Sequence, residues 1–301
     1  MNNGMHSELH FICFNTSYNR AYTLDNLYKS LIKQSDNDLT WVVVDDGSTD
    51  NTEELISEYI RQNLIKIEYI KQENSGKHIA INSGVNIIAT DLTMIVDSDD
   101  VLTVDAVKSI KEYWKKADKN NCVGVTFLRG YSETEVIGKK FPKNEMIDNA
   151  NKVRYNLGIS GDKAEVVRTE MLKKYPFPKF NGEKFLSEGI LWKQLGSGTK
   201  TLFINEIIYI TEYLSDGLTN SGRKLLIKNP LGAGLNAKLA MTKEFSFKMR
   251  LQNTLLYTAY GFFAKKKLSE IVHESGQSGL VITNLLFGWL IYRYWKNKYK
   301  L

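Results

Sequence analysis

Cysteine and proline are both scarce in this chain of 301 residues. The two cysteines, Cys13 and Cys122, lie far apart and lack a C-x-x-C spacing, which argues against a disulfide framework and a structural zinc site. The four prolines leave little room for a disordered linker. The first ten residues lack a basic segment followed by an apolar one, so we expect no signal peptide and a cytoplasmic protein.

An excess of charge of either sign is also missing from most of the chain. Residues 1–242 carry 30 Lys and Arg against 31 Asp and Glu, whereas residues 243–301 carry ten against three. A basic tail predicts an anionic surface as partner, and on charge alone this could be a membrane or a nucleic acid. The length predicts one large α/β domain, residues 1–220, followed by a helical C-terminal region, residues 221–301.

Strand-like and helix-like segments alternate along the first part of the chain. We expect strands at 9–15, 40–44, 66–70 and 92–96 and helices at 22–34, 49–61, 77–89 and 104–116. This alternation predicts a mostly parallel sheet flanked by helices, with ligands gathered beyond the carboxyl ends of the strands. Later segments predict strands at 122–130, 164–167, 201–204 and 207–213, a polar loop at 131–155 and a helix at 188–195.

Two acidic clusters directly follow two of these strands. The segment 45–48 (DDGS) ends the second strand, and the segment 97–100 (DSDD) ends the fourth. Either one alone is compatible with an ordinary turn and a helix cap. Together they put four or more carboxylates at one rim of the sheet, where their repulsion is costly without a cation. Hard oxygen ligands suit Mg²⁺ or Mn²⁺, so we predict a divalent cation there.

Three motifs, VVVDDGSTD, NSGKHIAINSG and IVDSDD, resemble glycosyltransferase family 2 in their order and spacing, and the resemblance extends over residues 9–213. It implies a Rossmann-like GT-A fold and metal-dependent, inverting transfer of a hexosyl or N-acetylhexosaminyl group. The implied donor is a nucleoside-diphosphate sugar, with UDP as the favoured nucleotide. The implied acceptor is a saccharide or a lipid-linked molecule in cell-envelope or capsular polysaccharide synthesis.

The resemblance also implies roles for single residues. Asp99 would bind the metal, Asp97 would approach the ribose, and Asp45 with the first strand would hold the base. The full set of donor-binding residues that it implies is Ser17, Asn19, Arg20, Asp45, Asp46, Gly76, Lys77, Asn82, Asp97 and Ser98.

The chain departs from the family pattern at two places. Ile81 occupies a position at which many members have an arginine. Lys77 is our candidate for the missing cationic contact to the base or diphosphate, and a solvated lysine is the alternative. Many members also carry a downstream histidine that binds the metal, but residues 210–219 contain none, so Glu212 or Asp216 would have to substitute.

A carboxylate is the expected general base, because direct displacement requires one near the acceptor hydroxyl. Family members often have an acidic pair four residues before an aromatic residue or leucine on a helix. Glu188 has this spacing to Trp192, although Ser187 replaces the other acid of the pair. Asp162 is the second candidate, acting on the acceptor or the donor sugar. An exposed helix charge is the alternative interpretation of Glu188.

The C-terminal region combines apolar and basic residues. A helix is expected at 245–263, and the uncharged residues 275–292 precede the basic, aromatic end RYWKNKYK. Because this uncharged stretch is short for a membrane-spanning helix, we predict an interfacial helix on the anionic inner face of the cell membrane. The apolar stretch argues against nucleic acid as partner. Packing against the rest of the chain or within a homo-oligomer is the alternative.

Two other functions fit parts of the pattern. A nucleotidyltransferase also holds a metal-bound nucleotide on a parallel sheet, but the segment FNTSYNRAYT lacks the glycines of a phosphate loop. A membrane-associated assembly subunit without activity would not need intact Asp45, Asp97 and Asp99. We therefore expect a glycosyltransferase.

Overall fold

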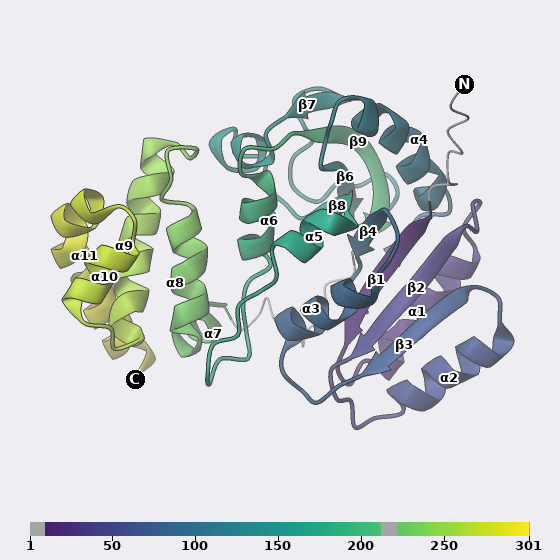
Figure 1. The fold of residues 1–301 in the computed structure, drawn as a ribbon, viewed down its shortest axis with the longest axis horizontal. Coiled ribbons are helices and arrows are strands. Elements are labelled where there is room, and N and C mark those ends of the chain that lie inside the picture. Colours follow the sequence, from purple (N-terminus) through teal and green to yellow (C-terminus); the bar gives the residue numbers. More distant parts are fainter. Residues whose placement is uncertain (1–9, 212–221, 301) are drawn as a thin grey trace, which may run out of the picture. The chain divides into compact units, whose positions relative to one another are not determined.

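The computed structural model describes residues 10–211 and 222–300, and these form two compact units (Figure 1). Within the described residues, the first unit contains the chain up to Asn149, then Ile159–Pro176 and residues 198–211. The second contains Ala150–Gly158, Phe177–Ser197 and residues 222–300. The domain boundary expected at residue 220 stays a prediction, and two segments that precede it fold with the C-terminal helices.

The first unit is built on a nine-stranded sheet. Its strands are β1 (Phe11–Ser17), β2 (Leu39–Asp45), β3 (Lys66–Lys71), β4 (Leu92–Ile95), β5 (Val101–Leu102), β6 (Gly124–Gly130), β7 (Met146–Asp148), β8 (Lys163–Arg168) and β9 (Thr201–Ile210). Their order is β3-β2-β1-β4-β8-β6-β9-β5, and β7 also pairs with β9. The strands from β3 to β4 run parallel, whereas β8 is antiparallel to both β4 and β6.

The predicted α/β fold is confirmed, and its parallel half has the expected element order. The helices of the first unit are α1 (Ala21–Ile32), α2 (Thr52–Gln62), α3 (Lys77–Ile87), α4 (Ala106–Lys119) and α5 (Thr169–Lys174). The second half of the sheet is mixed rather than parallel. The strands expected at 201–204 and 207–213 form one strand, β9, and the loop expected at 131–155 contains β7 and a π-helical turn, Lys152–Asn156.

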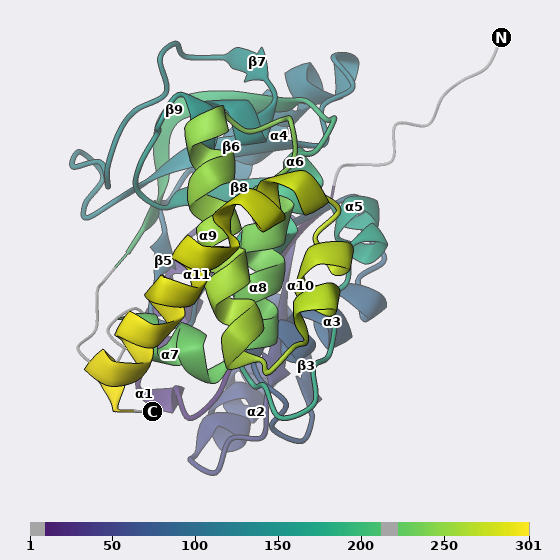
Figure 2. The ribbon, with the colours of Figure 1, turned by 90° about the vertical axis from the view of Figure 1, so that its left-hand side faces the viewer.

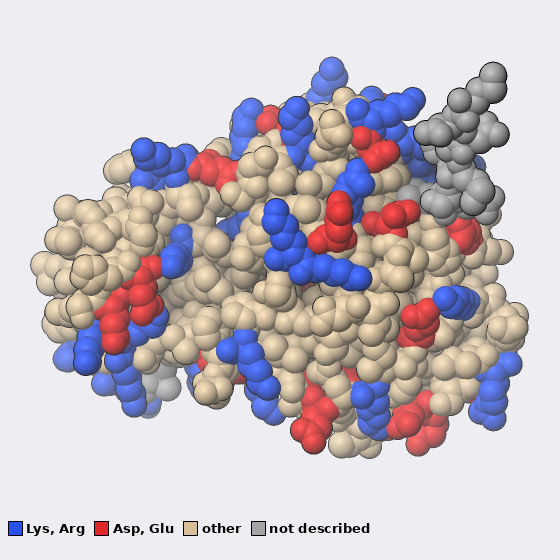
Figure 3. Space-filling view, in the orientation of Figure 1, with Lys and Arg blue, Asp and Glu red and all other residues tan. Residues whose placement is uncertain are grey.

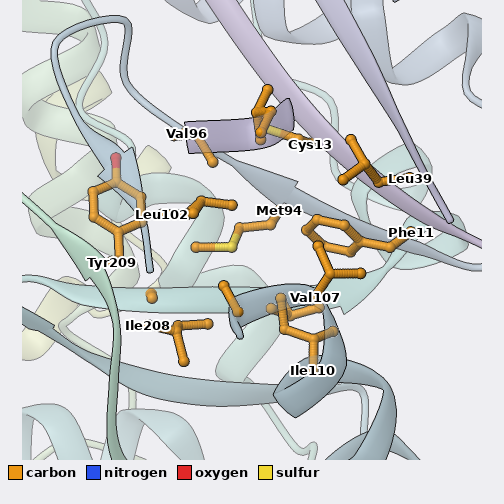
Figure 4. Close-up of a cluster of buried hydrophobic side chains, with 14 of the residues drawn as sticks. Phe11, Cys13, Leu39, Met94, Val96, Leu102, Val107, Ile110, Ile208 and Tyr209 are labelled. Carbon is orange, nitrogen blue, oxygen red and sulfur yellow. The ribbon is translucent and has the colours of Figure 1, made fainter. Parts of the chain in front are cut away.

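Helices cover both faces of the parallel half. β2 is buried along its whole length, which explains the unbroken β-branched run in its sequence. On one face, Phe11 and Cys13 join a large apolar cluster with Val107 and Ile110 of α4 (Figure 4). Residues of α1 and α2 belong to the same cluster. On the other face α3 approaches β1 so closely that a Cβ atom at Gly84 would lie 2.3 Å from the ring of Phe14.

The second unit is helical. Its helices are α6 (Gly189–Gly196), α7 (Gly222–Lys228), α8 (Pro230–Leu239), α9 (Phe247–Phe263), α10 (Leu268–Glu274) and α11 (Ser278–Tyr299). α11 runs beside α9 (Figure 2), and a Cβ atom at Gly288 would lie 2.5 Å from the Cβ atom of Thr258. None of the helices in the described ranges has both the length and the apolar character needed to cross a membrane.

Candidate functional site

Asp45 ends β2 and holds the turn that follows it. Its side chain is fully buried. Oδ1 accepts a hydrogen bond from the backbone N–H of Ser48 at 2.7 Å, and Oδ2 accepts one from the hydroxyl of Tyr69 on β3 at 2.8 Å. Burial and the neighbouring carboxylate raise the pKa of Tyr69, so its hydroxyl remains a donor. The contact with a nucleobase that the resemblance implies for Asp45 stays a prediction.

Asp46 fastens the loop that leads into α3. Its Oδ1 accepts hydrogen bonds from Nε2 of Gln72 at 2.7 Å and from the N–H of Ser75 at 2.9 Å. Its Oδ2 accepts the N–H of Gly76 at 2.8 Å. The motifs DDGS and NSGK are therefore joined in space through one buried carboxylate. This brings the first turn of α3, which begins at Lys77, to the rim of the sheet.

Gly47 is required for this arrangement. Its φ is +82°, and an added Cβ atom would lie 2.8 Å from the backbone nitrogen of Asn74. We expect Gly47→Ala to lower the free energy of unfolding by at least about 2 kcal/mol, because backbone strain and a steric clash add up. Gly158→Ala is the matched control, since Gly158 has a φ of +65° and nothing within 4 Å of its Cβ position. Denaturant unfolding that shows equal losses in both variants would contradict the steric argument.

The turn after β1 supplies the next predicted donor residues. Asn19 adopts a left-handed conformation, its N–H donates to Oγ of Ser48 at 2.9 Å, and its Oδ1 accepts the N–H of Thr49 at 2.8 Å. Ser17 is buried beside Asp45 in the register between β1 and β2. The structure therefore brings the loop after β1 and the loop after β2 together.

Three further predicted donor residues are Arg20, Asn82 and Ser98. Burial and the Asp97 charge raise the pKa of Asp99, and Arg20 lies near enough for its charge to offset part of that rise. Asn82 is half-buried on α3, and Ser98 is buried within the acidic segment. Their contacts with a donor stay predictions.

Asp97 is held from three directions. Oδ1 lies 2.5 Å from Nζ of Lys77, and Oδ2 lies 3.4 Å from Nη1 of Arg129. Its backbone N–H donates to the hydroxyl of Tyr209 at 2.9 Å. Burial alone would raise the pKa of Asp97, but the Lys77 and Arg129 charges hold it well below its usual range. Asp97 is therefore a fixed anion, and Lys77 is an ion-pair partner rather than a freely solvated lysine.

The other two carboxylates of this segment, Asp99 and Asp100, both have a raised pKa. Burial and the charge of Asp97 raise the pKa of Asp100 to about 7, although Nη1 of Arg129 lies 3.5 Å from its Oδ2. Burial and Asp97 also raise the pKa of Asp99. Asp99 is half-buried and forms no ion pair with any residue in the described ranges. The excess negative charge of the segment is thus concentrated at Asp99.

This charge distribution fits one carboxylate ligand of a divalent cation. Within residues 10–211 and 222–300, no three His, Cys, Asp or Glu side chains are arranged to hold a metal ion by themselves. Mg²⁺ is usually bound through one or two carboxylates, with substrate phosphates and water completing its octahedron. Asp99 suits that role because a cation there would offset both causes of its raised pKa, burial and the Asp97 charge. The substitutes expected at Glu212 and Asp216 lie outside the described residues.

Arg129 and Tyr209 were not identified from the sequence. The guanidinium carbon of Arg129 on β6 lies 3.9 Å from the ring centre of Tyr209 on β9, and its Nε donates to the carbonyl of Lys163 at 2.9 Å. Neither residue belongs to a motif, because their meeting depends on the pairing of β6 with β9. The available signal was an arginine at the end of an apolar strand, VTFLRG.

We expect Arg129→Ala to weaken metal-dependent binding of a nucleoside diphosphate at least about tenfold, because Asp97 and Asp100 lose their shared cation. Arg129→Lys should recover part of this loss. Arg168→Ala is the matched control, since Arg168 also stacks on an aromatic ring, Trp114, and pairs with a carboxylate, Asp118. Calorimetric titration with UDP and Mn²⁺ measures the effect. Equal losses in the two alanine variants would show that Arg129 acts only on stability.

Asp162 lies in the first unit, directly before β8. The next residue, Lys163, is buried, and its ammonium donates to four backbone carbonyls at 2.9 to 3.3 Å, those of Ile137, Ser160, Gly161 and Asp162. The carbonyl of Lys163 in turn accepts Nε of Arg129. Asp162 is therefore fixed to the same network as Asp97, and its role as a base stays a prediction.

Glu188 lies in the second unit, at the N-cap position of α6. Further along the same helix, Lys193 is buried, and its Nζ donates to Oδ1 of Asn236 at 2.6 Å. Burial lowers the pKa of Lys193 to about 8. Because Glu188 and the acidic segment belong to different units, their meeting at one site stays a prediction.

Comparison with known proteins gives the family. The model of Glycosyl transferase family 2 matches residues 15–175. Glycosyltransferase GlyG of Streptococcus pneumoniae is 24% identical over 207 residues, which are 64% of this chain and 67% of GlyG. Two further curated relatives match this chain over smaller shares of their own length, 32% and 16%.

Solved structures show the same fold at low sequence identity. TarS of S. aureus in complex with UDP-GlcNAc has a TM-score of 0.65 and 17% identity, covering 97% of this chain and 92% of that one. The mannosyltransferase PcManGT from Pyrobaculum calidifontis, in complex with GDP-Man and Mn²⁺, has a TM-score of 0.57 and 16% identity, covering 97% and 87%. Since the family model matches more than half of the sequence and includes all three motifs, the chain belongs to glycosyltransferase family 2.

Proposed function

We propose that this chain transfers a sugar, with inversion, from a UDP-linked donor to a hydroxyl acceptor in cell-surface polysaccharide or glycoconjugate synthesis. The observation that carries the proposal is Asp97 fixed between Lys77 and Arg129, with Asp99 left as the excess carboxylate. Membership of the family favours sugar transfer over nucleotidyl transfer. The TarS complexes with UDP and UDP-GlcNAc support UDP as the nucleotide and a hexose or N-acetylhexosamine as the sugar.

The donor would bind across the loops that follow β1, β2 and β4. In this arrangement Asp97 accepts the ribose hydroxyls, and Arg129 keeps its carboxylate in place. The N-terminus of α3, where the helix dipole is positive, favours the diphosphate. Lys77 begins this helix, so its ammonium can turn from Asp97 to a phosphate oxygen when the donor enters.

We place a divalent cation, Mn²⁺ or Mg²⁺, at Asp99. The Mn²⁺ in the PcManGT complex supports a metal in this fold. When bound, such an ion neutralises the charge that develops on the leaving diphosphate. Asp99 supplies the protein's anionic ligand, and Arg129 prevents Asp97 and Asp100 from adding further uncompensated charge.

Inversion requires a single displacement. The acceptor oxygen forms a bond to the anomeric carbon on the face opposite the diphosphate, and the bond from that carbon to the diphosphate oxygen breaks. Glu188, with Asp162 as the alternative, accepts the proton from the acceptor hydroxyl. The acceptor in this proposal is a saccharide or a lipid-linked saccharide, and the protein acts in the cytoplasm at the inner face of the cell membrane.

Thermal unfolding with UDP, GDP, CDP and ADP, each with and without Mn²⁺, tests the proposal. We expect UDP with Mn²⁺ to give the largest stabilisation, about 2.7 kcal/mol at 100 times the dissociation constant. Release of UDP from UDP-sugars by the purified protein then identifies the donor. A protein that none of these nucleotides stabilises, with or without Mn²⁺, would contradict the proposal.

A further inference from the structure

One side of α11 is apolar although it faces away from the other helices. Six large side chains on α11 have exposed fractions between 39% and 63%: Ile282, Leu286, Phe287, Trp289, Leu290 and Tyr294. Their spacing places them on one side of the helix. A surface helix normally turns its polar side outward, so this pattern is reversed. We call these six residues the outer face of α11.

The opposite side of α11 is fixed to the rest of the second unit. Gly288 lies directly against Thr258 of α9, and Val281 is buried in a small apolar cluster. The ring of Trp295 lies 5.7 Å from that of Tyr260, between ring centres. These contacts set the rotation of the helix, so the outer face cannot turn inward without losing them.

Cationic residues follow the apolar part of the outer face. The last two turns of the helix and its C-cap carry Arg293, Lys296, Lys298 and Lys300, all of them exposed. α11 contains no acidic residue that could neutralise them. In the view of Figure 3, the surface over α10 and α11 shows a broad uncharged area, and both basic and acidic side chains lie along its lower edge. The outer face thus joins an apolar area to a positively charged end.

We propose that the outer face of α11 docks the protein on an anionic lipid surface. Ile282, Leu286 and Leu290 enter the boundary between headgroups and acyl chains, where apolar side chains leave water. Trp289 and Tyr294 occupy the headgroup level, which aromatic residues with a polar atom prefer. The cationic end contacts lipid phosphates. This inference deepens the proposed location and rests on it, but it does not depend on the sugar-transfer chemistry.

A second copy of the chain fits this face less well. It would also cover the apolar side chains, but α11 has no carboxylates to offer to the cationic end. A parallel pair of α11 helices would bring the two cationic ends together, and an antiparallel pair would set each one against an uncharged half. Anionic lipid satisfies both the apolar area and the charge.

Vesicle binding by the full-length protein tests the proposal. Flotation with phosphatidylcholine vesicles, with and without phosphatidylglycerol, measures the partition coefficient. We expect stronger binding to the anionic vesicles, and we expect Leu286→Glu to lower it at least about tenfold. Leu64→Glu is the matched control because Leu64, outside α11, is 61% exposed and Leu286 is 63% exposed. The control should stay within about twofold of the unmodified protein.

A second variant tests the charge. Replacing Lys296, Lys298 and Lys300 together with glutamine should remove the preference for anionic vesicles and leave binding to neutral ones nearly unchanged. Both α11 variants should bind UDP with Mn²⁺ as the unmodified protein does. An unmodified protein that binds vesicles but no nucleotide would count against the proposed sugar transfer and not against the docking face. A loss of vesicle binding alone in the variants supports the docking face.

Two results would overturn the inference. One is a full-length protein that ignores both kinds of vesicle. The other is a dimer in light scattering that Leu286→Glu converts to a monomer without any change in vesicle binding, because a second copy would then cover the outer face. If Leu286→Glu does not fold, Leu290→Asn removes apolar contact from the same face without adding charge.

Discussion

Replacing Asp99 with alanine is expected to abolish the metal-dependent part of nucleotide binding. Asp99 is the carboxylate of the acidic segment that forms no ion pair with the described residues, and burial with the Asp97 charge raises its pKa. A hard divalent cation would lose its anionic protein ligand, and the diphosphate would lose the bridge to the protein. We expect the affinity for UDP in Mn²⁺ to fall at least about 100-fold, to its value without metal.

Calorimetric titration with UDP, with and without Mn²⁺, measures this effect. Asp91→Ala is the matched control, since Asp91 is an exposed aspartate just before β4, at the other end of the strand from Asp99. Unfolding does not account for the expected loss, because the Asp99 charge adds to the burial and the Asp97 charge that raise the pKa of Asp100. Removing Asp99 relieves that repulsion, so the unfolding midpoint should stay the same or rise. Unchanged Mn²⁺-dependent affinity in Asp99→Ala would refute the assignment.

The parallel half of the sheet could be predicted because its signals are local. The apolar run of β2 indicates burial on both faces, and the acidic turns mark the ends of β2 and β4. A parallel sheet brings those ends to one edge whatever the details of packing. The hydrogen bonds between Asp46 and the loop before α3 could not be predicted from such local signals. They are made by a buried side chain, and no sequence pattern reveals its partners.

The mixed half of the sheet could not be predicted in the same way. β8 lies between β4 and β6 and is antiparallel to both, which follows from long-range pairing and not from any spacing. Arg129 and Tyr209 meet Asp97 only through that pairing. Resemblance to the family predicted roles for Asp97 and Asp99, and the structure adds the residues that hold Asp97.

The C-terminal helices show another limit of sequence patterns. The uncharged stretch predicted a helix, and α11 extends it through the basic end to Tyr299. Composition did not show which side of the helix would face the unit. That side is set by Gly288, the residue at which α11 approaches α9 closely.

Glu188→Gln is expected to separate sugar transfer from donor binding. The amide has nearly the shape of the carboxylate but cannot accept the proton of the acceptor hydroxyl, so we expect turnover to fall at least about 100-fold. Donor affinity should remain nearly unchanged, because the predicted donor-binding residues lie in the first unit and Glu188 lies in the second. Turnover with the preferred UDP-sugar and acceptor, measured beside calorimetric titration of UDP with Mn²⁺, checks both expectations.

Asp162→Asn, made in parallel, decides between the two candidate bases. Asp162 accepts a hydrogen bond from the buried Lys163 through its backbone carbonyl, which Asp162→Asn leaves intact. If Glu188 is the base, Asp162→Asn should leave turnover and donor affinity nearly unchanged, whereas Glu188→Gln should lower turnover alone. A large loss of turnover in Asp162→Asn, with nearly unchanged turnover in Glu188→Gln, would assign the base to Asp162. It would also leave Glu188 as a charge at the N-terminus of α6, where an acidic side chain is favourable without any part in catalysis.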